Sequence, residues 1–283
     1  MIIQMYKTFP TFLGLLLGLL IIASAFGIEA QESNPHTVRT TKFTVQDVDA
    51  STAFYEDLVG MTELDRFEAG DSLVEPFMAF QDDGKRIGLL RFTEYENIQK
   101  SSHPVSVLVV PSLDAIIKRF NDANYPITQH IGITSAGYGA SEAGGVNTAI
   151  IHDPSGNGIE LIETGGRATV AGARLIVTDR KEAEEFFVRI FDVTATERLQ
   201  TDSYDEVVMD FGGGMFIALF EPTDEAPLPK SEHPVVAIYS TAADEVLERV
   251  RTEGLGVEEF GGFMFLAKDP SGNVIEVVRQ RTP

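Results

Sequence analysis

A ten-residue segment occurs twice in this chain and restricts its fold more than any other feature. Residues 153–162 read DPSGNGIELI, and residues 269–278 read DPSGNVIEVV. The Asp-Pro-Ser-Gly-Asn part is typical of a turn, because Pro presets φ and Gly or Asn accepts a positive φ. The residues that follow are apolar and β-branched around a single Glu, so they predict a strand. Alternation along that strand places Glu160 on one face and Ile159 and Leu161 on the other.

The rest of the chain is duplicated as well. Residues 100–105 (KSSHPV) match residues 230–235 (KSEHPV), and Asp47 before the first predicted helix matches Asp179 before the third. Each half contains two units in which a strand, a helix and three strands follow one another. The sequence therefore predicts an α+β fold of four βαβββ modules, arranged as two tandem domains over residues 37–164 and 169–280. The second half lacks most of the Gly-rich loop at residues 132–145.

The turn followed by a Glu-containing strand resembles the last strand of the vicinal-oxygen-chelate (VOC) superfamily. This superfamily includes glyoxalase I, extradiol dioxygenases and the fosfomycin and bleomycin resistance proteins. The resemblance covers about residues 37–280 and implies sheets that curve around cavities, with metal ligands from four strand positions in the metal-dependent members. Those positions carry Thr40, Gly88 (or Leu89), Val105 and Glu160 in the first domain, and Gly172, Ala218, Val235 and Glu276 in the second.

Of the four ligand positions in each domain, only the one occupied by Glu keeps the ligand of the resembled family, and a stable metal site needs at least three converging ligands. The sequence therefore predicts that no metal cofactor is bound. Bleomycin resistance proteins are the precedent for binding a small organic molecule without a metal. The alternative is a metal-dependent VOC lyase of the glyoxalase type or a dioxygenase, with one divalent metal held by Glu160 and displaced ligands such as His103, His130 or His152. Whether either domain is an enzyme stays open.

Each predicted cavity also receives a cation. Alternation places Thr40, Lys42 and Thr44 on one face of the first strand, and Arg174 on the corresponding face in the second half. Because a buried lone carboxylate is costly whereas a paired one need not be, we expect Lys42 to pair with Glu160 and Arg174 to pair with Glu276. In the alternative, the cations extend to the rim. Tyr138 in the Gly-rich loop completes the predicted ligand cavity, and the first domain is the better binding candidate.

The N-terminus predicts export. Residues 12–25 (FLGLLLGLLIIASA) resemble the apolar core of a signal peptide over residues 1–30, with cleavage after Ala25 or Ala30. The mature protein would then be periplasmic or extracellular, unless the segment stays uncleaved as a membrane anchor. The chain has no Cys, which excludes disulfides and thiolate ligands. Its net charge of −21 argues against nucleic acids and anionic lipids as partners. A small molecule is the expected partner, a homodimer stays open, and His36 is expected in a linker.

Overall fold

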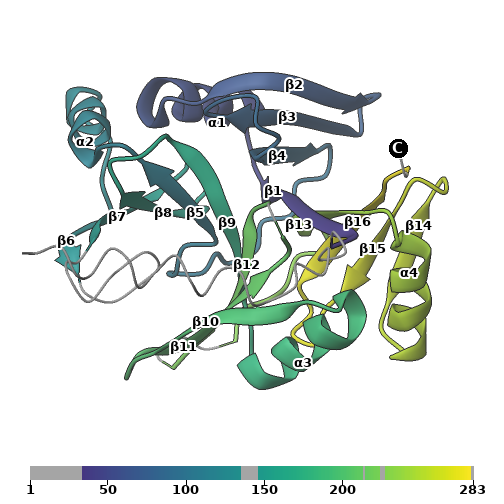
Figure 1. Ribbon diagram of the computed structural model, residues 1–283. Helices are drawn as coiled ribbons and strands as arrows, with labels where there is room; N and C mark the ends of the chain where they lie inside the picture. Colours follow the sequence, from purple (N-terminus) through teal and green to yellow (C-terminus); the bar gives the residue numbers. More distant parts are fainter. Residues whose placement is uncertain (1–33, 135–145, 213, 224–226, 282–283) are drawn as a thin grey trace, which may run out of the picture. The chain divides into compact units, whose positions relative to one another are not determined.

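Two eight-stranded sheets, sheet A and sheet B, organise the structure (Figure 1). The structure is a computed structural model that describes residues 34–134, 146–212, 214–223 and 227–281, so the predicted signal peptide lies outside the described residues. Residues 34–283 group as one unit by their internal contacts. Among the described residues, no helix has the length and apolar character needed to cross a membrane.

The four predicted modules are present, which confirms the predicted fold class. Module 1 contains β1 (His36–Thr44), α1 (Val48–Ala53), the π-helix η2 (Phe54–Val59), β2 (Thr62–Ala69), β3 (Leu73–Ala79) and β4 (Arg86–Phe92). Module 2 contains β5 (Ser106–Val110), α2 (Leu113–Asp122), β6 (Gln129–Thr134), β7 (Val146–His152) and β8 (Gly158–Glu163). Module 3 contains β9 (Thr169–Ile176), α3 (Arg180–Phe191), β10 (Thr194–Gln200), β11 (Tyr204–Asp210) and β12 (Phe216–Pro222). Module 4 contains β13 (Pro234–Ser240), α4 (Ala243–Thr252), β14 (Val257–Phe260), β15 (Met264–Lys268) and β16 (Val274–Arg279).

The sheets do not follow the two halves of the sequence. Sheet A has the order β14-β15-β16-β13-β1-β4-β3-β2 and joins module 1 to module 4. Sheet B has the order β10-β11-β12-β9-β5-β8-β7-β6 and joins module 2 to module 3. In each sheet, antiparallel pairing of the first strands of two modules makes the junction, β1 with β13 and β5 with β9. The boundaries 37–164 and 169–280 therefore do not separate the sheets, and the modules pair within one chain.

Local sequence signals explain where the helices begin and end. The Asp47 carboxylate accepts a hydrogen bond from the backbone N–H of Ala50 at 3.0 Å, and Asp179 accepts one from Glu182 at 2.9 Å. Both are N-caps that satisfy a free N–H of the first helical turn. Gly60 ends η2 with a φ of 90°, a backbone conformation that residues with a Cβ rarely adopt.

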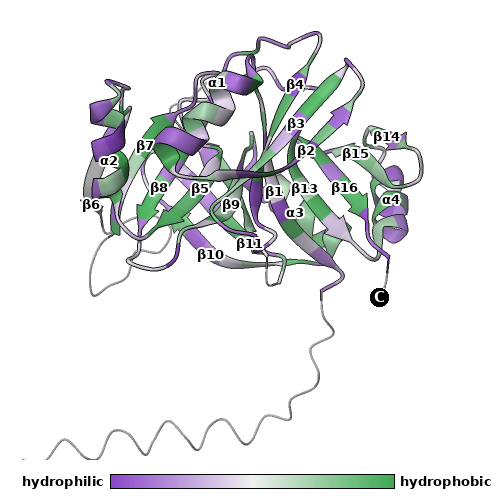
Figure 2. Ribbon diagram, turned by 90° about the horizontal axis from the view of Figure 1, so that it is seen from above, coloured by the Kyte–Doolittle hydropathy of each residue, from purple (hydrophilic) through white to green (hydrophobic). Residues whose placement is uncertain are grey.

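The helices bury their apolar faces against the sheets and leave hydrophilic residues outside. In α3 the buried residues are Ala183, Phe186, Phe187, Ile190 and Phe191. Figure 2 shows hydrophobic residues along the central strands of both sheets and hydrophilic residues on the outer sides of α2 and α4. His36 is not in a linker as expected. It is the first residue of β1, it is buried, and its Nδ1 lies 2.8 Å from the hydroxyl of Ser240.

Candidate functional site: two buried ion-pair clusters and the cavities beside them

The repeated turns are rigid because their own Asp side chains close them. The Asp153 carboxylate accepts hydrogen bonds from the backbone N–H groups of Ser155 (2.9 Å) and Asn157 (2.8 Å). It also accepts one from the side-chain amide of Asn157 at 2.8 Å. Asp269 binds Asn273 in the same way, at 2.7 and 2.8 Å. The motif that dominates the sequence therefore forms a structural turn.

Each turn also connects one sheet to the other. Asn157, in the turn before β8 of sheet B, donates from its side-chain amide to the carbonyl of Thr44 at the end of β1 in sheet A (3.2 Å). Asn273, in the turn before β16 of sheet A, donates in the same way to the carbonyl of Ile176 at the end of β9 in sheet B (3.1 Å). Modules that are neighbours in sequence are therefore joined by these turns, although they contribute to different sheets.

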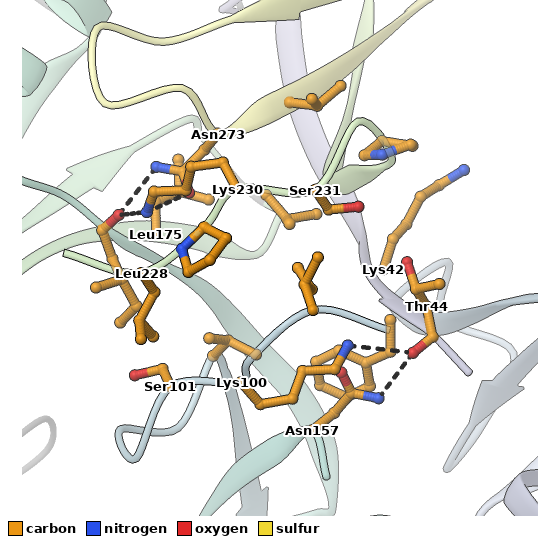
Figure 3. Close-up of a pocket in the computed structure, with 18 of the residues that line it drawn as sticks. Lys42, Thr44, Lys100, Ser101, Asn157, Leu175, Leu228, Lys230, Ser231 and Asn273 are labelled. Carbon is orange, nitrogen blue, oxygen red and sulfur yellow. Dashed lines mark hydrogen bonds between the residues drawn. The ribbon is translucent and has the colours of Figure 1, made fainter. Parts of the chain in front are cut away.

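A central cavity of about 110 Å³ lies between these two contacts (Figure 3). The ammonium of Lys100 also donates to the carbonyl of Thr44, at 3.4 Å, and the ammonium of Lys230 donates to the carbonyl of Ile176, at 2.7 Å. Burial lowers the pKa of Lys100. The lining residues include Val105, Val235, Pro229, Pro234, Leu228, Ile98, Lys42 and Arg174. A cavity of this size has room for only a few water molecules. Lys42 and Arg174 on its wall belong to two buried ion-pair clusters.

The first is the sheet A cluster, formed by Lys42, Glu75 and Glu276. The Lys42 ammonium lies 2.6 Å from a carboxylate oxygen of Glu276 and 3.0 Å from one of Glu75. The side chain of Lys42 is only 4% exposed, that of Glu75 5% and that of Glu276 10%. Lys42 comes from β1, Glu75 from β3 and Glu276 from β16, so the cluster spans both modules of the sheet.

The second is the sheet B cluster, formed by Arg174, Glu160 and Glu206. The guanidinium of Arg174 binds Glu206 through Nε at 2.6 Å and Glu160 through Nη2 at 2.9 Å. Its Nη1 donates to the carbonyl of Pro104 at 3.1 Å. The group also lies over the ring of Phe220, at 5.2 Å from the ring centre. All three nitrogens of the guanidinium therefore donate a hydrogen bond to a partner inside the protein.

Burial and opposite charge act against each other in these clusters. Burial disfavours the charge on Lys42, but the carboxylates of Glu276 and Glu75 outweigh it and raise the pKa of Lys42. Burial raises the pKa of Glu75, with the nearby charge of Glu276 adding to it and Lys42 opposing it. Despite its burial, the two carboxylates beside Arg174 raise the pKa of its guanidinium. Each cation therefore stays charged and balances at least one carboxylate.

The sequence predicted the wrong Glu partner for each of the two buried cations. Lys42 binds Glu276 rather than Glu160, and Arg174 binds Glu160 rather than Glu276. The cause is the sheet topology, because module 1 pairs with module 4 and module 2 with module 3. Both cations are buried, so they do not extend to the rim.

Sequence reasoning missed two members of the clusters, Glu75 and Glu206. Glu75 follows Lys42 by 33 residues, and Glu206 follows Arg174 by 32 residues. Each is an acidic residue beside the apolar residues of a strand, LVEPFMA in β3 and YDEVVMD in β11. Their nearly equal spacing within the duplication was the signal that could have found them.

The residues at the positions that the VOC resemblance assigns to metal ligands do not fit a divalent metal. In sheet A these positions are Thr40, Gly88, Val235 and Glu276, and in sheet B they are Gly172, Ala218, Val105 and Glu160. The space is also filled. A Cβ added to Gly88 would lie 2.2 Å from a carboxylate oxygen of Glu75, and one added to Gly172 would lie 2.2 Å from the ring of Phe216. The single carboxylate in each set already binds a cation.

The alternative metal ligands are not brought together. The His103 ring packs against Phe220, with 4.9 Å between ring centres. His130 is exposed on β6, with its Nε2 3.1 Å from the amide oxygen of Asn147, and Nδ1 of His152 lies 2.6 Å from the hydroxyl of Thr128. Among the described residues, no group of three or more His, Asp or Glu could hold a metal ion. Tyr138 lies outside the described residues, so its predicted place in the cavity stays a prediction.

The two sheets differ on the sides that carry the clusters. Strand register places Thr40, Phe77, Arg86, Leu266, Tyr239 and Val278 on the same side of sheet A as Lys42, which we call the Lys42 face. Thr40 and Thr44 are buried there, whereas Phe77, Tyr239, Leu266 and Val278 are half-buried. On the Arg174 face of sheet B, Val208 and Ile162, which correspond to Phe77 and Val278, are buried, whereas Val109 and Ile150, which correspond to Tyr239 and Leu266, are half-buried.

The Arg174 face nevertheless contains a hollow of about 420 Å³ next to Phe216. Its apolar lining consists of Val109, Ala171, Val208, Met215 and Phe216, and its polar lining of Lys85, Thr169, Thr196, Glu197 and Asp210. Since ligand sites for small organic molecules measure roughly 300–1,000 Å³ and combine apolar walls with a few polar groups, this hollow has the size and chemistry of such a site.

Comparison with known proteins supports the same architecture. Residues 35–161 match the family model described as Glyoxalase/Bleomycin resistance protein/Dioxygenase superfamily. Glyoxalase I from Zea mays is 15% identical, with a TM-score of 0.70 over 86% of this chain and 92% of that chain. A putative dioxygenase from Bacillus subtilis subsp. subtilis str. 168 is 14% identical, with a TM-score of 0.64 over 86% of this chain and 84% of that chain. No curated protein sequence matches this chain. At such identities the structural likeness establishes the fold alone.

Proposed function

We propose that this chain, whose residues 35–161 match the Glyoxalase/Bleomycin resistance protein/Dioxygenase superfamily, binds a small organic molecule without a divalent metal. The observation that carries the proposal is a buried cation bound to the Glu that stands at the family's metal-ligand position in each sheet. Lys42 lies 2.6 Å from Glu276 and Arg174 lies 2.9 Å from Glu160. Because an ammonium or guanidinium already neutralises the carboxylate, the site has neither the charge nor the ligands that attract a metal ion.

We place the ligand in the 420 Å³ hollow of sheet B. Its apolar wall around Phe216 and Val208 provides a surface for an organic body, and Glu197 and Asp210 provide hydrogen-bond acceptors for polar substituents. Among the described residues, Glu197 forms no ion pair within 4.0 Å, so its carboxylate is available to a ligand. Binding without chemistry is the mode that bleomycin resistance proteins provide within the superfamily.

Ligand screening in the presence of EDTA tests both parts of the proposal. We expect compounds that raise the melting temperature to bind with the same Kd with and without the chelator. Ala171→Phe fills the hollow and should weaken binding at least tenfold. Ala168→Phe introduces the same side chain at a half-buried position three residues earlier that does not line the hollow, and should leave the Kd unchanged.

Two results would contradict the proposal. If elemental analysis after dialysis against Zn²⁺, Mn²⁺ and Fe²⁺ gives about one ion per chain that is lost in Glu160→Ala, the protein has a metal site. If Ala171→Phe and Ala168→Phe change the Kd equally, the ligand does not occupy the hollow.

We further propose that residues 1–30 direct export and are removed, on the basis of the apolar segment at residues 12–25. Mass spectrometry of the protein recovered from its native host measures the new N-terminus. We expect cleavage after Ala25 or Ala30, and an intact N-terminus in the membrane fraction would instead indicate an anchor.

A further inference from the structure

Two arginines of sheet A flank a single tyrosine. Nη2 of Arg86 donates to the hydroxyl of Tyr239 at 3.1 Å, and its Nε donates to the hydroxyl of Thr40 at 3.4 Å. The Arg86 guanidinium also lies over the ring of Phe77, at 4.3 Å from the ring centre. The Arg39 guanidinium lies 5.6 Å from the centre of the Tyr239 ring. Neutral hydroxyls and π faces hold both groups without neutralising them.

Neither arginine has a carboxylate within 4.0 Å among the described residues. Many other cations of this acidic chain, which has 43 acidic and 22 basic residues, form such an ion pair. Arg66, on the edge strand β2 of the same sheet, binds Glu63 at 2.7 Å. Glu75 is close enough to Arg86 to feel its charge, but its oxygen is occupied by Lys42 at 3.0 Å. Arg86 therefore keeps N–H donors and positive charge for another group.

Apolar side chains surround this charge on the Lys42 face. Phe77, Tyr239, Leu266 and Val278 are half-buried, and Phe67, which register places opposite Glu75, is 50% exposed. On the corresponding face of sheet B, Val208 and Ile162 are buried, and the open part is the hollow next to Phe216. An exposed apolar surface around a partly desolvated guanidinium favours a ligand that has an apolar body and one negative charge.

We propose that the Lys42 face of sheet A binds an organic carboxylate, with its oxygens on Arg86 and its apolar body on Phe77 and Tyr239. A planar guanidinium matches the two oxygens of a carboxylate, and charge-assisted hydrogen bonds are stronger than neutral ones. Arg39 adds a second positive charge beside Tyr239. The two sheets then serve different ligands, since the hollow of sheet B carries two carboxylates, Glu197 and Asp210, against one cation, Lys85, and so is less favourable for an anion.

Phenylacetate and phenylacetamide form a matched pair of probes for isothermal titration calorimetry, because they differ mainly in charge. We expect wild-type protein to bind phenylacetate at least tenfold more tightly than phenylacetamide. Arg86→Gln should abolish that preference, and Arg86→Lys should reduce it by losing the planar fork. Arg66→Gln is the control, because it removes the same charge from the same sheet at a residue already bound to Glu63, and it should keep the full preference.

Two further variants separate this inference from the proposed function. Arg39→Gln changes an exposed residue, and should weaken phenylacetate binding several-fold even if Arg86→Gln does not fold. Ala171→Phe fills the hollow of sheet B and should leave phenylacetate binding unchanged. The inference is overturned if wild-type protein binds neither probe, if it binds both equally, if Arg86→Gln or Arg39→Gln keeps the wild-type preference, or if Ala171→Phe abolishes phenylacetate binding.

Discussion

Replacing Lys42 by Met should destabilise the protein by an amount that depends on pH. Methionine keeps the length of the side chain but leaves Glu75 and Glu276 buried without their cation. Removing one partner of a buried ion pair typically costs about 3–5 kcal/mol. One of the two carboxylates can escape this cost by binding a proton, and that limits the loss.

The limit can be worked from the ordinary pKa of 4.5 for Glu. Protonating such a group costs about 1.36 kcal/mol for each pH unit above its pKa, which is about 3.4 kcal/mol at pH 7 and about 0.7 kcal/mol at pH 5. In the folded variant the pKa of this carboxyl is raised above its unfolded value. The folded variant therefore binds more protons than the unfolded chain, and its stability relative to wild type falls as the pH rises from 5 to 7.

Urea denaturation of a double-mutant cycle measures the pairing directly. Lys42→Met combined with Glu276→Gln should recover much of the loss, with a coupling of at least about 2 kcal/mol. Lys42→Met combined with Glu160→Gln should be additive to within about 0.5 kcal/mol, because Glu160 binds Arg174 instead. The exposed pair Lys118–Asp122 is the control, with an expected coupling of about 0.5 kcal/mol or less.

A coupling below about 0.5 kcal/mol between Lys42 and Glu276 would refute the buried pair. A larger coupling with Glu160 than with Glu276 would refute the module pairing. An effect of Lys42→Met that is the same at pH 5 and pH 7 would refute the role of proton uptake.

Three further substitutions test other parts of the structure. Burial, with Arg249 adding to it, lowers the pKa of His36 from 6.5 to about 4. The native state should therefore lose up to about 3.4 kcal/mol as the pH falls from 6.5 to 4, and urea denaturation of His36→Gln should show a smaller loss over that window. Asn157→Ala removes the hydrogen bond between the turn and Thr44 and should cost about 1–3 kcal/mol by thermal denaturation, whereas Asn157→Asp should not restore it because a carboxylate cannot donate. Gly88→Ala places a Cβ 2.2 Å from Glu75 and should cost about 1–3 kcal/mol in urea, and an unchanged midpoint would mean that Glu75 does not occupy that space.

The sequence by itself determined the modules and the character of the buried faces. Turn residues and alternation are local signals, so the four βαβββ units were predicted correctly, and Asp47 and Asp179, which the sequence places before the first and third helices, cap these helices. Alternation also predicted that Lys42 and Arg174 point to the same faces as the repeated Glu residues, because side-chain direction in a strand depends only on its period of two.

Only the tertiary structure decided which residues meet. Module 1 could pair with module 2 or module 4, and both arrangements satisfy the same local patterns, so the sequence did not distinguish Glu160 from Glu276 as the partner of Lys42. The antiparallel junctions β1 with β13 and β5 with β9 made that choice. The same junctions brought the Tyr239 hydroxyl to Arg86, 153 residues away in the chain. Contacts at such separation depend on strand order and register across modules, and no local pattern encodes these.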